Sequence, residues 1–207
     1  MTEARPQTRI QKKNRETILD AALDVFSTEG FRGATLDQIA GAASLSKPNV
    51  LYYFSSKEAI YTELLSKLLD TWLDPLRALD AQGDPIDELV AYMRRKFEMS
   101  RQFPRESRLF ANEIVQGAPR IADEITGPLK SLVDTTAALI QSWIDAGRLA
   151  PVDPHHLIFS IWATTQHYAD FDVQVRGILA PTGDSHLDEA EAFLVTLYTR
   201  TLTPTSD

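Results

Sequence analysis

The chain has 207 residues, and its 43% hydrophobic and 24% charged residues are ordinary for a globular protein that buries its own core. It contains no cysteine, which excludes disulfides and thiolate metal sites, and no run of about 18 apolar residues, so we expect no transmembrane helix. The polar N-terminus lacks the apolar segment of a secretion signal, and we therefore expect a cytoplasmic protein.

Charge is unevenly distributed along the chain. Residues 1–57 contain eight Lys or Arg and six Asp or Glu, a net charge of +2, whereas residues 58–207 contain 13 and 23, a net charge of −10. A mildly basic N-terminal part on an acidic remainder indicates that only the first part meets an anionic partner. A solvated basic segment without a partner is the alternative, and composition does not decide between the two.

Apolar residues recur at helical spacing along the whole chain, and no segment alternates convincingly like a strand, so we expect an all-α fold. Three short helices are predicted first: one that Gly30 ends, one over 35–42 that Thr35 caps, and one over 46–52 that Ser46 caps. Six longer helices are predicted to begin near residues 55, 84, 105, 121, 153 and 187 and to end near residues 79, 103, 116, 146, 177 and 202. A kink is expected near Gly127-Pro128. We predict two domains, the head (residues 1–57) and the body (residues 58–207).

The two short helices over 35–42 and 46–52 are separated by about three residues, which is the spacing of a helix-turn-helix. In this motif the N-terminal end of the second helix meets base edges in the major groove. Lys47 suits guanine acceptors or a phosphate, and Asn49 suits adenine. The candidate DNA contacts are Thr35, Ser46, Lys47, Pro48, Asn49, Tyr52, Tyr53 and Lys57. Packing inside the protein is the alternative for Tyr53.

The head resembles the signature of the TetR family of transcriptional regulators. Its matching residues, in order, are Thr35, Ile39-Ala40, Ser46, Leu51-Tyr52-Tyr53-Phe54 and Ser56-Lys57-Glu58. The resemblance implies a dimer that binds a palindromic DNA operator and responds to a small-molecule effector. One departure lies at the turn, where the family usually has glycine and this chain has Ala43-Ser44. If the turn requires a positive φ, Ser44 is modestly strained.

In the body, Trp162 and Gln166 lie four residues apart and so share one helix face. An indole beside a carboxamide suits a flat polar heterocycle, because the ring stacks while the amide donates and accepts in one plane. The ordinary alternative is a tryptophan in the core and a glutamine at the surface.

The body also resembles the pyrimidine-sensing members of the TetR family, through the stretches SRLF (107–110), TGPLKSLVD (126–134) and IWATTQHYADF (161–171). This resemblance implies uracil or thymine as the effector. The residues assigned to the ligand pocket by this reasoning are Trp72, Phe110, Asn112, Glu113, Trp162, Gln166 and Tyr168. A salt bridge to Arg108 or Arg120 is the alternative for Glu113. Departures from the family pattern at Ala111, Asn112, Ile114 and Gln116 leave another planar metabolite open as the effector.

No cofactor or metal site is expected, because adjacent His155 and His156 do not converge on one helix face. No nucleophile–base arrangement supports catalysis, so we predict that the chain is not an enzyme. Two apolar stripes offer a dimer interface if they face outward: Leu157, Ile161, Thr165 and Tyr168 on one helix, and Phe193, Leu197 and Leu202 on the last. The competing function classes are a helical small-molecule-binding protein or enzyme that does not bind DNA, and a structural DNA-binding protein without an effector.

Overall fold

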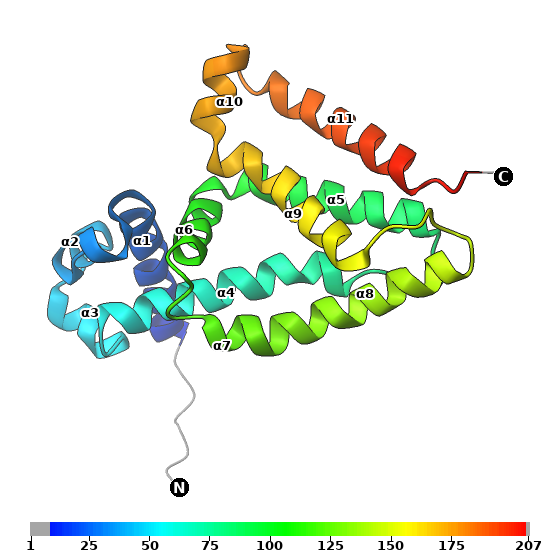
Figure 1. Cartoon of the computed structure of the whole chain (residues 1–207). Coiled ribbons are helices and arrows are strands. Elements are labelled where there is room, and N and C mark those ends of the chain that lie inside the picture. Colours follow the sequence, from blue (N-terminus) through cyan, green and yellow to red (C-terminus); the bar gives the residue numbers. More distant parts are fainter. Residues whose placement is uncertain (1–8, 206–207) are drawn as a thin grey trace, which may run out of the picture.

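The structure is a computed structural model that describes residues 9–205 (Figure 1). The first eight residues, which begin the polar N-terminus, lie outside the described part. Within 9–205 the chain is helical and has no strand, which confirms the all-α prediction. The elements are α1 (Arg9–Gly33), α2 (Leu36–Ala42), α3 (Lys47–Tyr53), α4 (Lys57–Arg77), α5 (Pro85–Gln102), α6 (Pro104–Val115), α7 (Ala122–Glu124), the π-helical turn η1 (Ile125–Leu129), α8 (Lys130–Asp145), α9 (Pro154–Asp170), α10 (Asp172–Leu179) and α11 (Ser185–Leu202). None of the helices in this part is long and apolar enough to cross a membrane.

Local capping residues set the ends of the head helices. Thr35 caps α2 in a reciprocal capping box with Gln38, and the Ser46 hydroxyl accepts a hydrogen bond from the Asn49 amide at the start of α3. The turn between these helices does require a left-handed residue, since Ser44 has φ 55°. The helix predicted to begin near residue 55 is α4, which Ser56 caps and whose first helical residue is Lys57.

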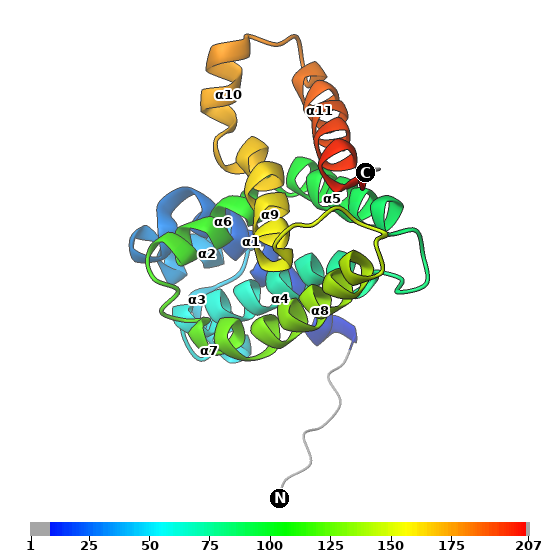
Figure 2. The ribbon, with the colours of Figure 1, turned by 45° about the vertical axis from the view of Figure 1, so that its right-hand side comes forward.

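The hydrophobic core of the head continues into the body. Phe26, Ile39 and Val50 belong to the same buried cluster as Tyr61 of α4 and Leu109 of α6. Helix α6 lies directly against α1 in both ribbon views (Figures 1 and 2). The head is therefore anchored on the body by shared apolar packing. The domain boundary at residue 57 stays a prediction based on charge.

A second buried cluster holds the body together, and α5 and α9 lie at its centre. Helix α9 packs on α5, α6 and α8, while α11 packs on α5 (Figure 2). Leu157, Ile161 and Thr165 of α9 are buried in this core. The prediction that this stripe faces a second copy of the chain is therefore wrong, because the apolar face of α9 packs against neighbouring helices of its own chain.

Two long helices predicted in the body are interrupted. The expected kink near Gly127-Pro128 is confirmed as the π-helical turn between α7 and α8, which accommodates a proline that cannot donate a backbone hydrogen bond. The helix predicted over 153–177 breaks at Phe171, whose φ is −115° and ψ is 24°. No glycine or proline marks this break. Side-chain contacts on either side hold it, since Asp170 accepts a 2.5 Å hydrogen bond from Ser107 of α6.

Candidate effector cavity and nucleic-acid interface

The N-terminal end of α3 is exposed, as a DNA-reading helix requires. Ser46 and Thr35 use their hydroxyls to cap α3 and α2, so each sets the start of one of the two short helices. Lys47 Nζ lies 2.9 Å from an Asp37 carboxylate oxygen, and both side chains are largely exposed. A surface ion pair of this kind is weak and exchanges readily with an outside anion. Asn49 makes no side-chain hydrogen bond with the described residues and is exposed to solvent.

The other candidate DNA contacts differ in their exposure and in the hydrogen bonds that they already make within the protein. Tyr52 is 69% exposed, whereas the Tyr53 hydroxyl accepts a 2.9 Å hydrogen bond from Asn14 inside the head. Lys57 Nζ donates to the carbonyl oxygens of Phe31 (2.6 Å) and Ala34 (2.7 Å). An ammonium has three donors, so one remains for a phosphate. Lys57 thus fastens the α1–α2 junction to the start of α4, a role that its place in the sequence did not reveal.

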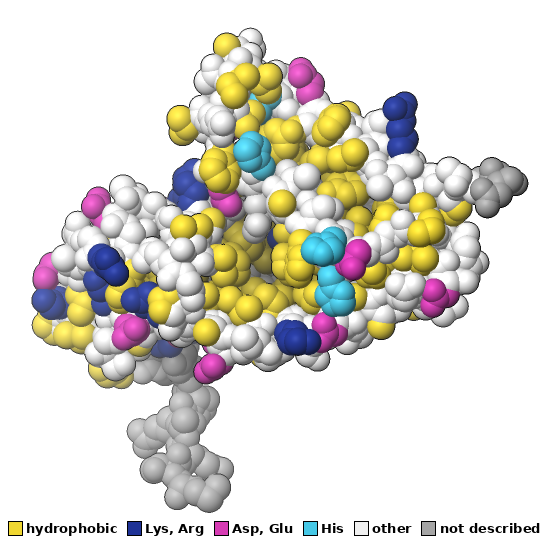
Figure 3. All heavy atoms as spheres, viewed as in Figure 1, with side chains coloured by type: hydrophobic (Ala, Val, Ile, Leu, Met, Phe, Trp, Pro, Cys, Tyr) yellow, Lys and Arg dark blue, Asp and Glu magenta, His cyan; other side chains and the backbone are white. Residues whose placement is uncertain are grey.

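A cavity of about 690 Å³ opens between α6, η1 and α9. A small recess of about 60 Å³ continues it toward α4 and α5, and both are lined by Phe110, Leu129, Trp162 and Gln166. Figure 3 shows a hollow between the head and the body with hydrophobic side chains along its wall. Of the predicted ligand residues, Phe110, Asn112, Trp162 and Gln166 line the cavity, and Trp72 lines the recess.

Trp162 and Gln166 of α9 lie on one helix face and line the cavity, as their spacing in the sequence predicted. Trp162 Nε1 donates a 2.6 Å hydrogen bond to the hydroxyl of Tyr92 on α5, so its polar group is already satisfied and the indole is held in place. What Trp162 offers to the cavity is therefore its aromatic surface. The Gln166 amide makes no hydrogen bond with any described residue. Trp72 and Phe110 close the recess, with their ring centroids 5.4 Å apart.

Glu113 does not line the cavity, so its assignment to the ligand pocket is wrong. Its side chain is completely buried and accepts hydrogen bonds from the backbone amide (2.9 Å) and Nη1 (3.2 Å) of Arg120. The guanidinium of Arg120 in turn lies over the ring of Phe31 in the head, 3.6 Å from its centroid. Burial and the neighbouring charge of Glu113 raise the pKa of Tyr61. The salt bridge considered as the alternative is the correct interpretation, and it joins α6 to the head.

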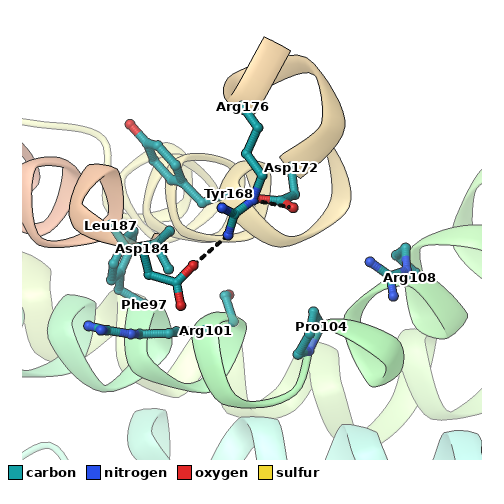
Figure 4. A pocket seen from close by; sticks show the side chains of 10 residues that line it. Phe97, Arg101, Pro104, Arg108, Tyr168, Asp172, Arg176, Asp184 and Leu187 are labelled. Atoms are coloured by element: carbon teal, nitrogen blue, oxygen red, sulfur yellow. Dashed lines mark hydrogen bonds and ion pairs between the residues drawn. The ribbon is translucent and has the colours of Figure 1, made fainter. Parts of the chain in front are cut away.

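Tyr168 also lies elsewhere. It lines a second cavity of about 250 Å³ together with Phe97 and Arg101 of α5 and Arg176 of α10 (Figure 4). Gln166 and Tyr168 are two residues apart, about 200° around a helix, so only one of them can face the effector cavity. In Figure 4, Arg176 of α10 reaches Asp172 and Asp184, at 2.9 Å and 2.6 Å. That second cavity is thus bordered by an internal ion-pair cluster.

Comparisons with known proteins bear on both halves of the chain. Residues 18–64 match the family described as bacterial regulatory proteins, tetR family, and residues 65–205 match the family described as YcdC-like protein, C-terminal region. Over 176 residues the chain is 51% identical to the HTH-type transcriptional regulator RutR of Escherichia coli O157:H7, covering 85% of this chain and 83% of that protein. It is 50% identical to the RutR of Escherichia coli K12 over the same shares.

The chain belongs to the TetR family. It is a transcriptional regulator, as its named relatives are, and not an enzyme. The fold of this TetR-family regulator is shared by more distant structures. The crystal structure of AibR with isovaleryl coenzyme A and operator DNA has a TM-score of 0.72 and 17% identity, covering 93% of this chain and 100% of that chain. A tetR-family regulatory protein from Rhodococcus RHA1 has a TM-score of 0.75 and 18% identity, covering 94% and 99%.

Among the lining residues of this TetR-family regulator that the sequence reasoning missed is a buried lysine. Lys96 of α5 lines the recess, is only 5% exposed, and holds its Nζ 4.9 Å from the ring centroid of Trp72. Burial lowers the pKa of Lys96 to about 8, so most of the side chains are still charged at neutral pH. The signal was present in the sequence, because Lys96 stands in the apolar stripe of α5 beside Met93 and Phe97. A lysine at such a core-facing position is rare unless it is paired.

Proposed function

We propose that this regulator represses transcription by binding a palindromic operator as a dimer, and that a free pyrimidine base, uracil or thymine, releases it from DNA. The observation that carries the effector assignment is the unpaired Gln166 amide beside the aromatic surfaces of Trp162 and Trp72. Uracil has a planar face for stacking and an edge on which acceptors and a donor alternate. A carboxamide pairs with such an edge in one plane. Such a regulator would act in the cytoplasm, on chromosomal DNA.

Release follows from a shift between two arrangements of the molecule. An effector that binds better to the arrangement in which the two reading helices do not match the operator raises the population of that arrangement. The resemblance of the body to pyrimidine-sensing members of the family supports the choice of ligand. The cavity is larger than a single base needs, and this favours keeping other planar metabolites in the first screen.

Thermal melting and calorimetry test the effector. Uracil or thymine is expected to raise the melting temperature, because a ligand that binds only the folded state stabilises it by mass action. If neither base gives heat or a thermal shift while another planar metabolite does, the pyrimidine assignment is wrong and the family assignment stands.

The proposed DNA contacts predict two different kinds of loss. Asn49→Ala is expected to relax specificity at one base position by ~1–3 kcal/mol, because its amide would read a base edge. Lys57→Ala is expected to weaken binding to all sequences and to reduce the salt slope by about one unit, if its third donor meets a phosphate. Gel-shift titrations against the operator and single-base variants measure both effects. Unchanged operator affinity in both variants would contradict the proposed interface.

The proposed dimer uses the outer surface of α10 and α11. Apolar side chains are exposed there: Val173 is 87%, Ile178 74%, Phe193 60% and Leu197 39% exposed. A two-fold axis through this surface would set two α3 helices about 34 Å apart, one turn of DNA. Patches of this kind on a monomer mark interaction sites.

Phe193→Glu is expected to convert the dimer into a monomer at micromolar concentration, since an unpaired carboxylate is costly to bury in an interface. Light scattering measures the mass in solution. Thr199→Glu, which adds the same charge elsewhere on α11, is the matched control and should remain dimeric. A wild-type monomer at that concentration, or a Phe193→Glu dimer, would contradict the assignment of this surface.

A further inference from the structure

Lys96 is a buried cation without a counter-ion in contact. Among the described residues its ammonium makes no hydrogen bond, and no carboxylate oxygen lies within ion-pair distance. Asp170 attracts it from the wall of the larger cavity, but that carboxylate is itself held by Ser107. The recess is therefore lined by the ammonium of Lys96, by the Gln166 amide, which has no hydrogen-bond partner among the described residues, and by apolar and aromatic side chains.

A buried ammonium in such surroundings is unfavourable without an oxygen acceptor. Withdrawing an ammonium from water costs solvation that only hydrogen bonds or an opposite charge restore. The face of Trp72 restores part of it through a cation–π interaction. What is missing is an oxygen acceptor, because an ammonium has donors only. A ligand that brings such an oxygen into the recess gains a charge-assisted hydrogen bond, roughly twice as strong as a neutral one.

We propose that Lys96 is the residue that sets ligand specificity in this cavity: its ammonium donates to an exocyclic oxygen of the ligand while Gln166 pairs with the adjacent ring edge. The class of ligand is then a planar oxo-heterocycle, and a poorer acceptor at that one position is disfavoured. This inference rests on the proposed pyrimidine effector. It adds which group of the protein discriminates among bases of the same shape.

Thiouracils test the inference, because replacing one carbonyl oxygen by sulfur weakens the acceptor at a single known position. Calorimetry compares uracil, 2-thiouracil and 4-thiouracil on the wild-type protein and on Lys96→Met, which keeps an unbranched side chain and removes the charge. In the wild type, one of the two thiouracils is expected to bind about 10- to 100-fold more weakly than uracil. In Lys96→Met that difference should vanish, and uracil itself should bind more weakly by a similar factor.

A second measurement separates ligand recognition from a structural role. Without ligand, Lys96→Met is expected to melt at or above the wild-type temperature, because replacing an unpaired buried charge by an apolar side chain is neutral or stabilising. Lys67→Met, at an exposed lysine of α4 that lines neither the cavity nor the recess, should leave all affinities unchanged. If uracil binds and the thiouracil pattern is the same in wild type and Lys96→Met, the inference is wrong and the proposed effector stands. If no pyrimidine binds the wild type, the proposed effector fails and the inference fails with it.

Discussion

Gln166→Leu is expected to abolish the stabilisation that uracil or thymine gives to the folded protein. The leucine keeps a similar volume, but it leaves the imide edge of the base unpaired when it is buried beside Trp162. With ligand at 100 times its Kd, the wild type should gain about 2.7 kcal/mol, and the variant should gain almost nothing. Thermal melting with and without the base measures the difference.

The same variant should keep its affinity for the operator, because α3 and the rest of the head are untouched. It should fail to release DNA when the base is added. Gln174→Leu, on the exposed side of α10, is the matched control and should respond to the base like the wild type. If Gln166→Leu binds uracil as tightly as the wild type, the effector site lies elsewhere.

Glu113→Ala is expected to destabilise the protein by about 1–3 kcal/mol, because it removes the buried acceptor of two Arg120 hydrogen bonds, while Glu58, 3.4 Å from Arg120 Nε, still pairs with the guanidinium. Glu113 is completely buried, and two hydrogen bonds from Arg120 end on its carboxylate. Urea denaturation of the protein measures the loss in the free energy of unfolding.

Glu189→Ala, at an exposed glutamate of α11, should change that free energy by less than about 0.5 kcal/mol. The double variant Glu113→Leu with Arg120→Met should recover much of the loss, since it removes both charges together. A loss below about 1 kcal/mol in Glu113→Ala would show that water reaches this ion pair and that it does not anchor the head.

Local signals in the sequence were sufficient for most helix ends. Thr35 with Gln38 and Ser46 before Pro48 act through the nearest backbone groups, and such effects do not depend on the rest of the fold. Gly30, predicted to end the first helix, has φ 66° and interrupts α1, which continues to Gly33. The positive φ of Ser44 was considered only because the family usually has glycine at this turn, and the structure confirms it. The break at Phe171 was not, because contacts from α6 and from the α10–α11 turn hold it, and these elements are distant in sequence.

Helix periodicity predicted two residues that line the cavity, whereas the resemblance placed Trp72, Phe110 and Asn112 correctly there and Glu113 and Tyr168 wrongly. Trp162 and Gln166 share a face by spacing, and both line the cavity. Tyr168 and Glu113 were assigned by resemblance of the surrounding sequence, which does not say which side of a helix a residue occupies. Lys96 was visible only as a charge in an apolar stripe. Its meaning required knowing that no carboxylate of residues 9–205 lies within ion-pair distance of its ammonium.

Helix α6 is a wall of the cavity through Phe110 and part of the head's support through Glu113. The size of a ligand and its affinity therefore have separate effects on release from the operator. In the proposed shift between two arrangements, a molecule that fits without displacing α6 would stabilise both equally and leave the operator bound, however high its affinity. A slightly larger one that moves α6 also moves the surface on which α1 rests. Tight binders that do not induce release, and weak binders that do, are both consistent with a single cavity in this regulator.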